Sequence, residues 1–66
     1  MALGGELKKA RLAAGITQEE LAFKAEISRN YVSLLELDEK SPTVQVLLRV
    51  CRALGVKASK IISRVE

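Results

Sequence analysis

The 66 residues of this chain allow one small domain, 1–66, which buries only about 60% of the surface that its unfolded chain exposes. Its net charge of +3 is a mild positive bias, compatible with nucleic acid but too small to indicate such a partner alone. A single cysteine, Cys51, and the absence of histidine exclude an internal disulfide and leave no plausible zinc site.

Apolar residues at helical spacing predict a first helix close to the N-terminus. Leu3, Leu7, Ala10 and Ala14 fall at i, i+4, i+7 and i+11, which places them on one stripe of an amphipathic helix. Gly15 then supplies a left-handed stop. We therefore expect a helix that ends just before Gly15.

Capping residues predict where the next two helices begin. Thr17 and Glu20 have the spacing of a capping box, in which the Thr17 hydroxyl accepts from the Glu20 amide and the Glu20 carboxylate reaches back. A second helix is thus expected over 18–25. Ser28 is another N-cap residue, and it predicts a third helix over about 28–36.

Two more helices follow from a start signal and a second apolar stripe. Ser41 is an N-cap residue followed by Pro42 at the first helical position, and Gly55 ends the fourth helix. The fifth is expected over 58–64. Nothing suggests a strand, so the sequence predicts a compact all-α domain of five helices. The stripe of the fourth helix consists of Val44, Leu47, Cys51 and Leu54.

The second and third helices and their short connection predict a helix-turn-helix over about 18–37. Such helices cross steeply, so a small residue must lie where they approach, and Ala22 fits. The third helix opens with polar side chains that have the chemistry to read DNA. Arginine bonds guanine O6 and N7, and asparagine bonds adenine N6 and N7. The apolar residues expected to fix the crossing angle from inside are Leu21, Ile27, Val32 and Leu35.

Outside such a motif, Arg29 and Asn30 would be ordinary solvated residues at a helix start. Inside it, we expect the helix over 28–36 to enter the major groove of double-stranded DNA. Leu34 is placed to meet a thymine methyl group, and the serines also have phosphate-binding hydroxyls. The residues expected to face the bases are Ser28, Arg29, Asn30, Ser33 and Leu34.

Several spaced motifs over residues 3–65 resemble the repressor/Cro-like helix-turn-helix family. That family includes phage repressors, restriction–modification controller proteins and antitoxins. The motifs are Leu7-Lys8-x-x-Arg11, Gly15-Ile16-Thr17-Gln18-Glu19-x-Leu21-Ala22, Ile27-Ser28-x-x-Tyr31-Val32-x-x-Leu35-Glu36, Ser41-Pro42 and Leu54-Gly55-Val56.

The resemblance implies a transcriptional regulator and a role for particular residues. Gln18 matches a glutamine that bonds a DNA phosphate and braces the recognition helix, and Tyr31 is expected to reach the DNA backbone rather than a base. Arg11 and Glu36 match a partly buried ion pair between the first and third helices. The full set expected to contact phosphates is Thr17, Gln18, Tyr31, Lys40 and Ser41.

Two positions depart from the family pattern. Glu26 stands in the turn, where glycine is frequent, and a left-handed backbone there costs of order 1–2 kcal/mol for a residue with a side chain. Asp38 replaces the usual glycine after the third helix, a milder change because aspartate tolerates that conformation.

The last two helices carry more apolar residues than one stripe needs. Either these residues widen the core, or they form a surface through which the chain dimerises. We expect a homodimer on a palindromic operator. The residues assigned to that interface are Val46, Val50, Ile62 and Val65.

The alternative function is a protein-interaction module, antitoxin-like or an adaptor. We expect no enzyme, since the sequence lacks an activated nucleophile pair, a metal constellation and a phosphate-binding glycine loop. We also expect no cofactor, no small-molecule ligand and no membrane span. The N-terminus has no signal-peptide pattern, so cytoplasmic residence is expected.

Overall fold

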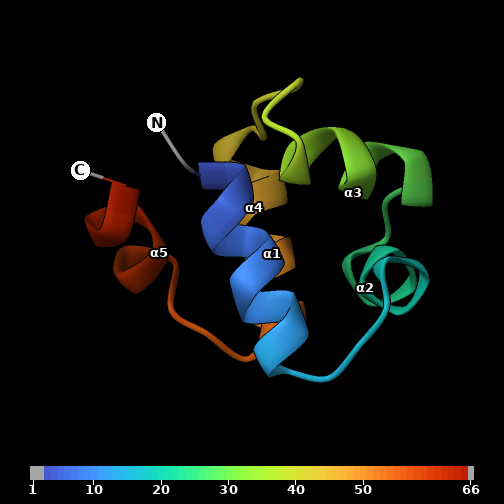
Figure 1. The fold of residues 1–66 in the computed structure, drawn as a ribbon, viewed down its shortest axis with the longest axis horizontal. Helices are drawn as coiled ribbons and strands as arrows, with labels where there is room; N and C mark the ends of the chain where they lie inside the picture. The colour runs from blue at the N-terminus through green and yellow to red at the C-terminus, as the bar shows by residue number, and fades with distance from the viewer. Residues whose placement is uncertain (1–2, 66) are drawn as a thin grey trace.

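A computed structural model describes residues 3–65, which fold into helices joined by short connections (Figure 1). The element bounds confirm an all-α domain, with no strand among the described residues. The prediction of five helices is likewise confirmed over this range. The helices are α1 (Leu3–Ala13), α2 (Gln18–Ala25), α3 (Arg29–Glu36), α4 (Val44–Leu54) and α5 (Ala58–Val65).

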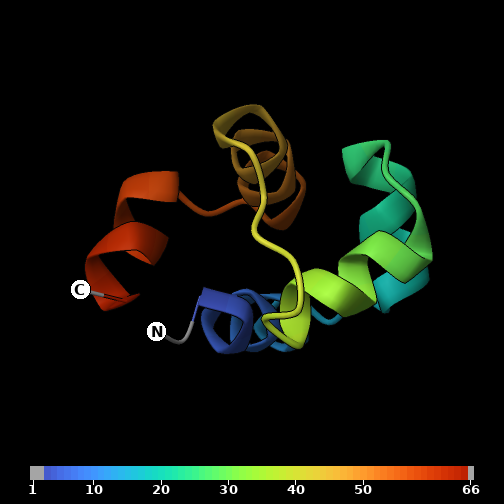
Figure 2. The same cartoon turned by 90° about the horizontal axis from the view of Figure 1, so that it is seen from above.

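Helices α1 and α4 lie at the centre of the fold, and the other three helices flank them on two sides. In Figure 2, α5 lies on one side of this pair, and α2 and α3 lie together on the other. Helix α2 packs against both α3 and α4, whereas α1 packs against α3 and α5. None of the helices over residues 3–65 is long and apolar enough to cross a membrane.

The capping residues of α2 and α3 act as their spacing predicts. The Thr17 hydroxyl accepts from the Glu20 amide at 3.0 Å, and the Thr17 amide donates to the Glu20 carboxylate at 3.0 Å. The Ser28 hydroxyl accepts from the Tyr31 amide at 3.0 Å. These bonds satisfy amides that the first turn of a helix leaves without a backbone partner.

The predicted start of α4 is wrong by two residues. Ser41 and Pro42 lie in the preceding loop, and Thr43 is the N-cap. Its backbone is extended, with φ −69° and ψ 164°, and its hydroxyl accepts from the Val46 amide at 3.1 Å. Thr43 offers the same capping hydroxyl as Ser41, but nearer to the apolar residues that α4 buries.

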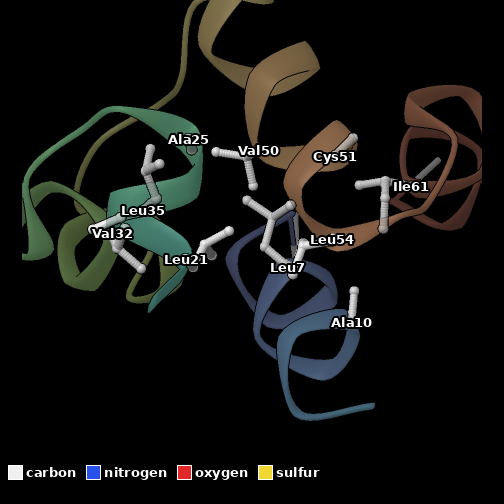
Figure 3. Packing of buried hydrophobic residues seen from close by; sticks show 11 residues of the cluster. Leu7, Ala10, Leu21, Ala25, Val32, Leu35, Val50, Cys51, Leu54 and Ile61 are labelled. Carbon is white, nitrogen blue, oxygen red and sulfur yellow. The ribbon is translucent and has the colours of Figure 1, made fainter. Parts of the chain in front are cut away.

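One apolar cluster joins all five helices (Figure 3). Leu7 comes from α1, Leu21 from α2, Val32 from α3 and Ile61 from α5, each no more than 1% exposed. The stripe predicted for α4 is wrong at Val44, which is 75% exposed because it stands one turn before the core. The α4 residues buried in the cluster are Val50, Cys51 and Leu54.

The first turn of α1 rests directly on the end of α3. Gly4 is buried, and a Cβ there would lie 2.5 Å from the Leu35 carbonyl oxygen and 2.6 Å from that of Glu36. The Gly4 amide donates to the Asp38 carboxylate at 2.8 Å. Asp38 has φ 59°, so its left-handed backbone turns the chain and its carboxylate caps α1. The aspartate therefore supplies a capping carboxylate that glycine lacks.

Candidate nucleic-acid interface

The α2–α3 unit is held from inside by buried apolar side chains. Ala22 is 5% exposed, and Leu21, Val32 and Leu35 are each 3% exposed or less. Glu26 ends α2 with φ 60° and ψ 43°, and its amide bonds the carbonyls of Ala22 and Phe23. Glu26 thus adopts a left-handed backbone, which is unfavourable for a residue other than glycine.

The opening turn of α3 presents polar side chains to solvent. Ser28, Arg29 and Asn30 are all exposed, whereas Val32 and Leu35, which lie further along the helix, are buried. Because Ser28 accepts a hydrogen bond as the N-cap, its hydroxyl proton is still free to donate. Within eight residues, α3 therefore combines an exposed polar start with apolar side chains that pack into the core.

The other residues assigned to base or backbone contact lie around this turn. Ser33 and Leu34 are half-buried, and Tyr31 is half-buried against the core. Lys40 and Ser41 are exposed in the loop between α3 and α4. A shallow open depression places part of the set together. Its lining includes Arg11, Thr17, Gln18 and Arg29.

A buried hydrogen-bonded network joins α1, α2 and α3. Arg11 Nε donates to Glu36 Oε2 at 2.7 Å, and Arg11 Nη2 donates to Oε1 at 3.2 Å. Both residues are 8% exposed. The Gln18 amide nitrogen donates to the same Oε1 at 3.1 Å, and Arg11 Nη1 donates to the Ile16 carbonyl at 2.9 Å. The second amide proton of Gln18 is left to bond a group outside the network.

Two residues that help to build this region were not predicted from the sequence. Arg49 on α4 donates to the carbonyls of Ala25 and Glu26, which close α2 and form the turn. Gly4 allows the close approach of α1 to α3. An arginine on a predicted amphipathic helix looks like any solvated charge, so only its position in the fold identifies its partners.

The predicted dimer interface is partly wrong. Val50 is 1% exposed and belongs to the core, since it lies one turn from Leu54 and faces the same way. Val46 and Val65 are half-buried, and Val46 packs against the core. Ile62 is 43% exposed. Of the four residues assigned to the interface, only Ile62 is exposed.

The thiol of Cys51 lies in the core, away from the residues assigned to DNA contact. Cys51 is buried in the core, and this burial raises the pKa of its thiol above the ordinary value. Among residues 3–65, no three His, Cys, Asp or Glu side chains are grouped so as to hold a metal ion. The chemistry that this region offers is hydrogen bonding and charge.

A short capped helix, a left-handed turn and a second helix with an exposed polar start define a helix-turn-helix domain. A family model described as helix-turn-helix matches residues 7–61. The chain belongs to the helix-turn-helix family.

Two relatives carry names that describe regulation. The chain is 37% identical over 62 residues to the immunity repressor protein of Bacillus phage phi105, covering 94% of this chain and 43% of that one. It is 36% identical over 66 residues to the transcriptional regulator ImmR of Bacillus subtilis, covering 100% of this chain and 52% of that protein. The chain thus spans about half the length of these relatives.

Solved structures share the fold over most of their length. The clp gene regulator ClgR from C. glutamicum has a TM-score of 0.89 at 35% identity, covering 94% of this chain and 80% of that one. The restriction–modification controller protein C.AhdI from Aeromonas hydrophila has a TM-score of 0.88 at 28% identity, covering 91% of both chains. The resemblance to the repressor and controller family is confirmed.

Proposed function

We propose that this chain is a sequence-specific DNA-binding domain of a transcriptional regulator, with α3 in the major groove. The observation that carries the proposal is the polar start of α3: Arg29 and Asn30 are exposed there, while Val32 and Leu35 anchor the helix in the core. Both exposed side chains can bond base edges in pairs of hydrogen bonds. The regulatory names of the relatives support the same function.

Phosphate contacts complete the proposed interface. Gln18 begins α2, where free amides and the helix dipole favour an anion, and Thr17 stands beside it. The bond to Glu36 holds the Gln18 amide in place, which leaves one N–H to donate to a phosphate oxygen. Lys40 and Ser41 are exposed in the loop that follows α3. Contacts of this kind fix the position of the helix without reading sequence.

The test of base reading begins with selection of bound sequences from a random duplex pool. Arg29→Ala should then weaken binding to the selected site by about 1–3 kcal/mol and relax the preference at one position. Arg52→Ala, an exposed arginine on α4, removes the same charge elsewhere and serves as the control. Equal loss on selected and random DNA would assign Arg29 to the phosphates instead.

The phosphate role of Gln18 has the opposite signature. Gln18→Ala should weaken binding to every duplex similarly, because the contact positions the domain rather than specifying a base. The measurement is binding to the selected site and to random DNA at matched salt. A loss confined to one base pair, with random binding intact, would contradict the assignment.

We also propose that the chain acts as a homodimer on a palindromic operator. One domain reads few base pairs, too few to select a site among the ~10⁶–10⁹ competing sites of a genome. A two-fold dimer doubles the readout and places the recognition helices one DNA turn, about 34 Å, apart. The proposed interface consists of the exposed Ile62 together with the half-buried Val46 and Val65.

Light scattering of an Ile62→Asp variant tests this interface. We expect a monomer with unchanged helicity and sharply weaker binding to the selected site. Phe23→Asp is the control, since Phe23 is 85% exposed on α2 and lies outside the proposed interface. Full affinity of a complex that contains one wild-type protomer would contradict the dimer.

The exposure of Phe23 favours a second candidate function, a protein-interaction module. An apolar side chain this exposed is a candidate partner contact. A salt titration separates the two functions, because neutralising phosphates makes affinity fall steeply with salt, and a protein interface need not behave so.

A further inference from the structure

We propose that Arg49 is a positioning residue that sets the orientation of α3 relative to α2. The inference rests on the proposed function only in naming α3 as the helix that reads DNA. Arg49 lies on α4, outside the helix-turn-helix itself. Its guanidinium reaches the turn, with Nε donating to the Ala25 carbonyl at 3.1 Å and Nη2 donating to the Glu26 carbonyl at 2.9 Å.

Neither of these two carbonyls receives a backbone hydrogen bond from the described part of the chain. The Glu26 amide donates to the Phe23 carbonyl, and the Ile27 amide donates to the Ala22 carbonyl. Both amides therefore bond to carbonyls within α2. Ala25 is the last residue of α2, and within residues 3–65 no backbone amide donates to its carbonyl or to that of Glu26. Carbonyls at the end of a helix need side chains or water when the chain turns away. Arg49 supplies both bonds from one rigid group.

The position of the turn makes this contact an orienting one. Ala25 and Glu26 precede the Ser28 N-cap by only three and two residues, so their peptide planes direct the chain into α3. Glu26 holds a left-handed backbone without being glycine, which needs support from its surroundings. Fixing both carbonyls restricts the torsions at Glu26 and hence the direction in which α3 leaves the turn.

The chemistry requires arginine rather than a positive charge alone. A cation at the end of α2 interacts favourably with the helix dipole, and lysine would keep that effect. Lysine, however, lacks the planar fork that holds two acceptors in a fixed relation. Arg49→Lys therefore removes the orienting contact while keeping the charge.

The first experiment needs no DNA. Residual dipolar couplings measured by NMR give the angle between α2 and α3 in the wild type and in Arg49→Lys. We expect a changed angle and shifted resonances at Glu26 and Ile27. Arg52→Lys, on the same helix, is the matched control and should change neither. An unchanged α2–α3 angle in a folded Arg49→Lys variant would overturn the proposal. If Arg49→Lys does not fold, Arg49→Met replaces it in the same measurement.

The second experiment connects the angle to DNA reading. For Arg49→Lys, affinity for the selected site should fall about tenfold, whereas affinity for random DNA at the same salt should stay within about twofold. Equal loss on both duplexes would overturn the role, because it would make Arg49 a phosphate contact. If the wild type binds no duplex DNA, the proposed function fails, and the α2–α3 angle still decides the role of Arg49.

Discussion

Truncation of Glu36 should destabilise the fold more than any surface change. Glu36→Ala removes the carboxylate that accepts from both Arg11 and Gln18, and it leaves the Arg11 guanidinium bonded only to the Ile16 carbonyl. Both ion-pair residues are 8% exposed, so water reaches the guanidinium poorly. Removing one partner of a buried pair costs about 3–5 kcal/mol.

That loss is large beside the stability expected of the whole domain. At about 0.05–0.15 kcal/mol per residue, a chain of 66 residues has a free energy of unfolding of about 3–10 kcal/mol. A domain of this size loses about 4–8 °C in Tm for each kcal/mol, so Glu36→Ala should lower Tm by about 12–40 °C. Urea and thermal unfolding followed by circular dichroism measure both quantities.

A double replacement separates loss of the pair from loss of packing. Arg11→Met with Glu36→Leu removes both charges and keeps apolar volume, and such replacements are often neutral or stabilising. We therefore expect the double variant to be much more stable than Glu36→Ala. A loss below about 1 kcal/mol for Glu36→Ala would refute the reasoning, because that is the range of an exposed ion pair.

Three further predictions concern Gly4, Glu26 and Cys51. Gly4→Ala should lower the free energy of unfolding in urea by about 1–3 kcal/mol, because the added Cβ would lie 2.5 and 2.6 Å from two backbone oxygens. Gly5→Ala, at an exposed position, should not, and equal effects of the two substitutions would contradict the close approach at Gly4. Glu26→Gly should raise the free energy of unfolding by about 0.5–1 kcal/mol, since relief of left-handed strain exceeds the added unfolded-state entropy. A decrease would show that Glu26 is not strained. Burial and the raised pKa keep the Cys51 thiol protonated at neutral pH, so iodoacetamide should modify it only as the domain unfolds. Rapid modification in native buffer would contradict this.

Local chemistry made the starts of α2 and α3 predictable. The Thr17 capping box and the Ser28 N-cap depend on neighbours three residues away, so their spacing shows directly in the sequence. The two caps mark the residues at which α2 and α3 begin. Local signals failed where two compete, since Thr43 and not Ser41 caps α4. The choice depends on which start brings the apolar residues of α4 onto the core.

The parts of the site that were not predicted depend on distant partners. Arg49 bonds a carbonyl 24 residues earlier in the chain, and Asp38 bonds an amide 34 residues earlier. The assignment of Val50 to a dimer interface was wrong for another reason. Leu47, Val50, Cys51 and Leu54 follow the standard helical spacing, so the sequence itself indicated that Val50 is buried. The predicted stripe instead took Val44, which lies beyond the edge of the core.

The orientation of α3 is imposed by other helices rather than by its own sequence. Eight residues are too few for a stable isolated helix, which needs about 12–15. Glu36 ties its end to α1 and α2, and Arg49 holds the turn before its start. Arg29 and Asn30 take no part in these contacts and stay exposed between them. Substitutions at these two positions should therefore change what α3 binds without unfolding the domain, whereas changes at Glu36 or Arg49 should alter the helix that carries them.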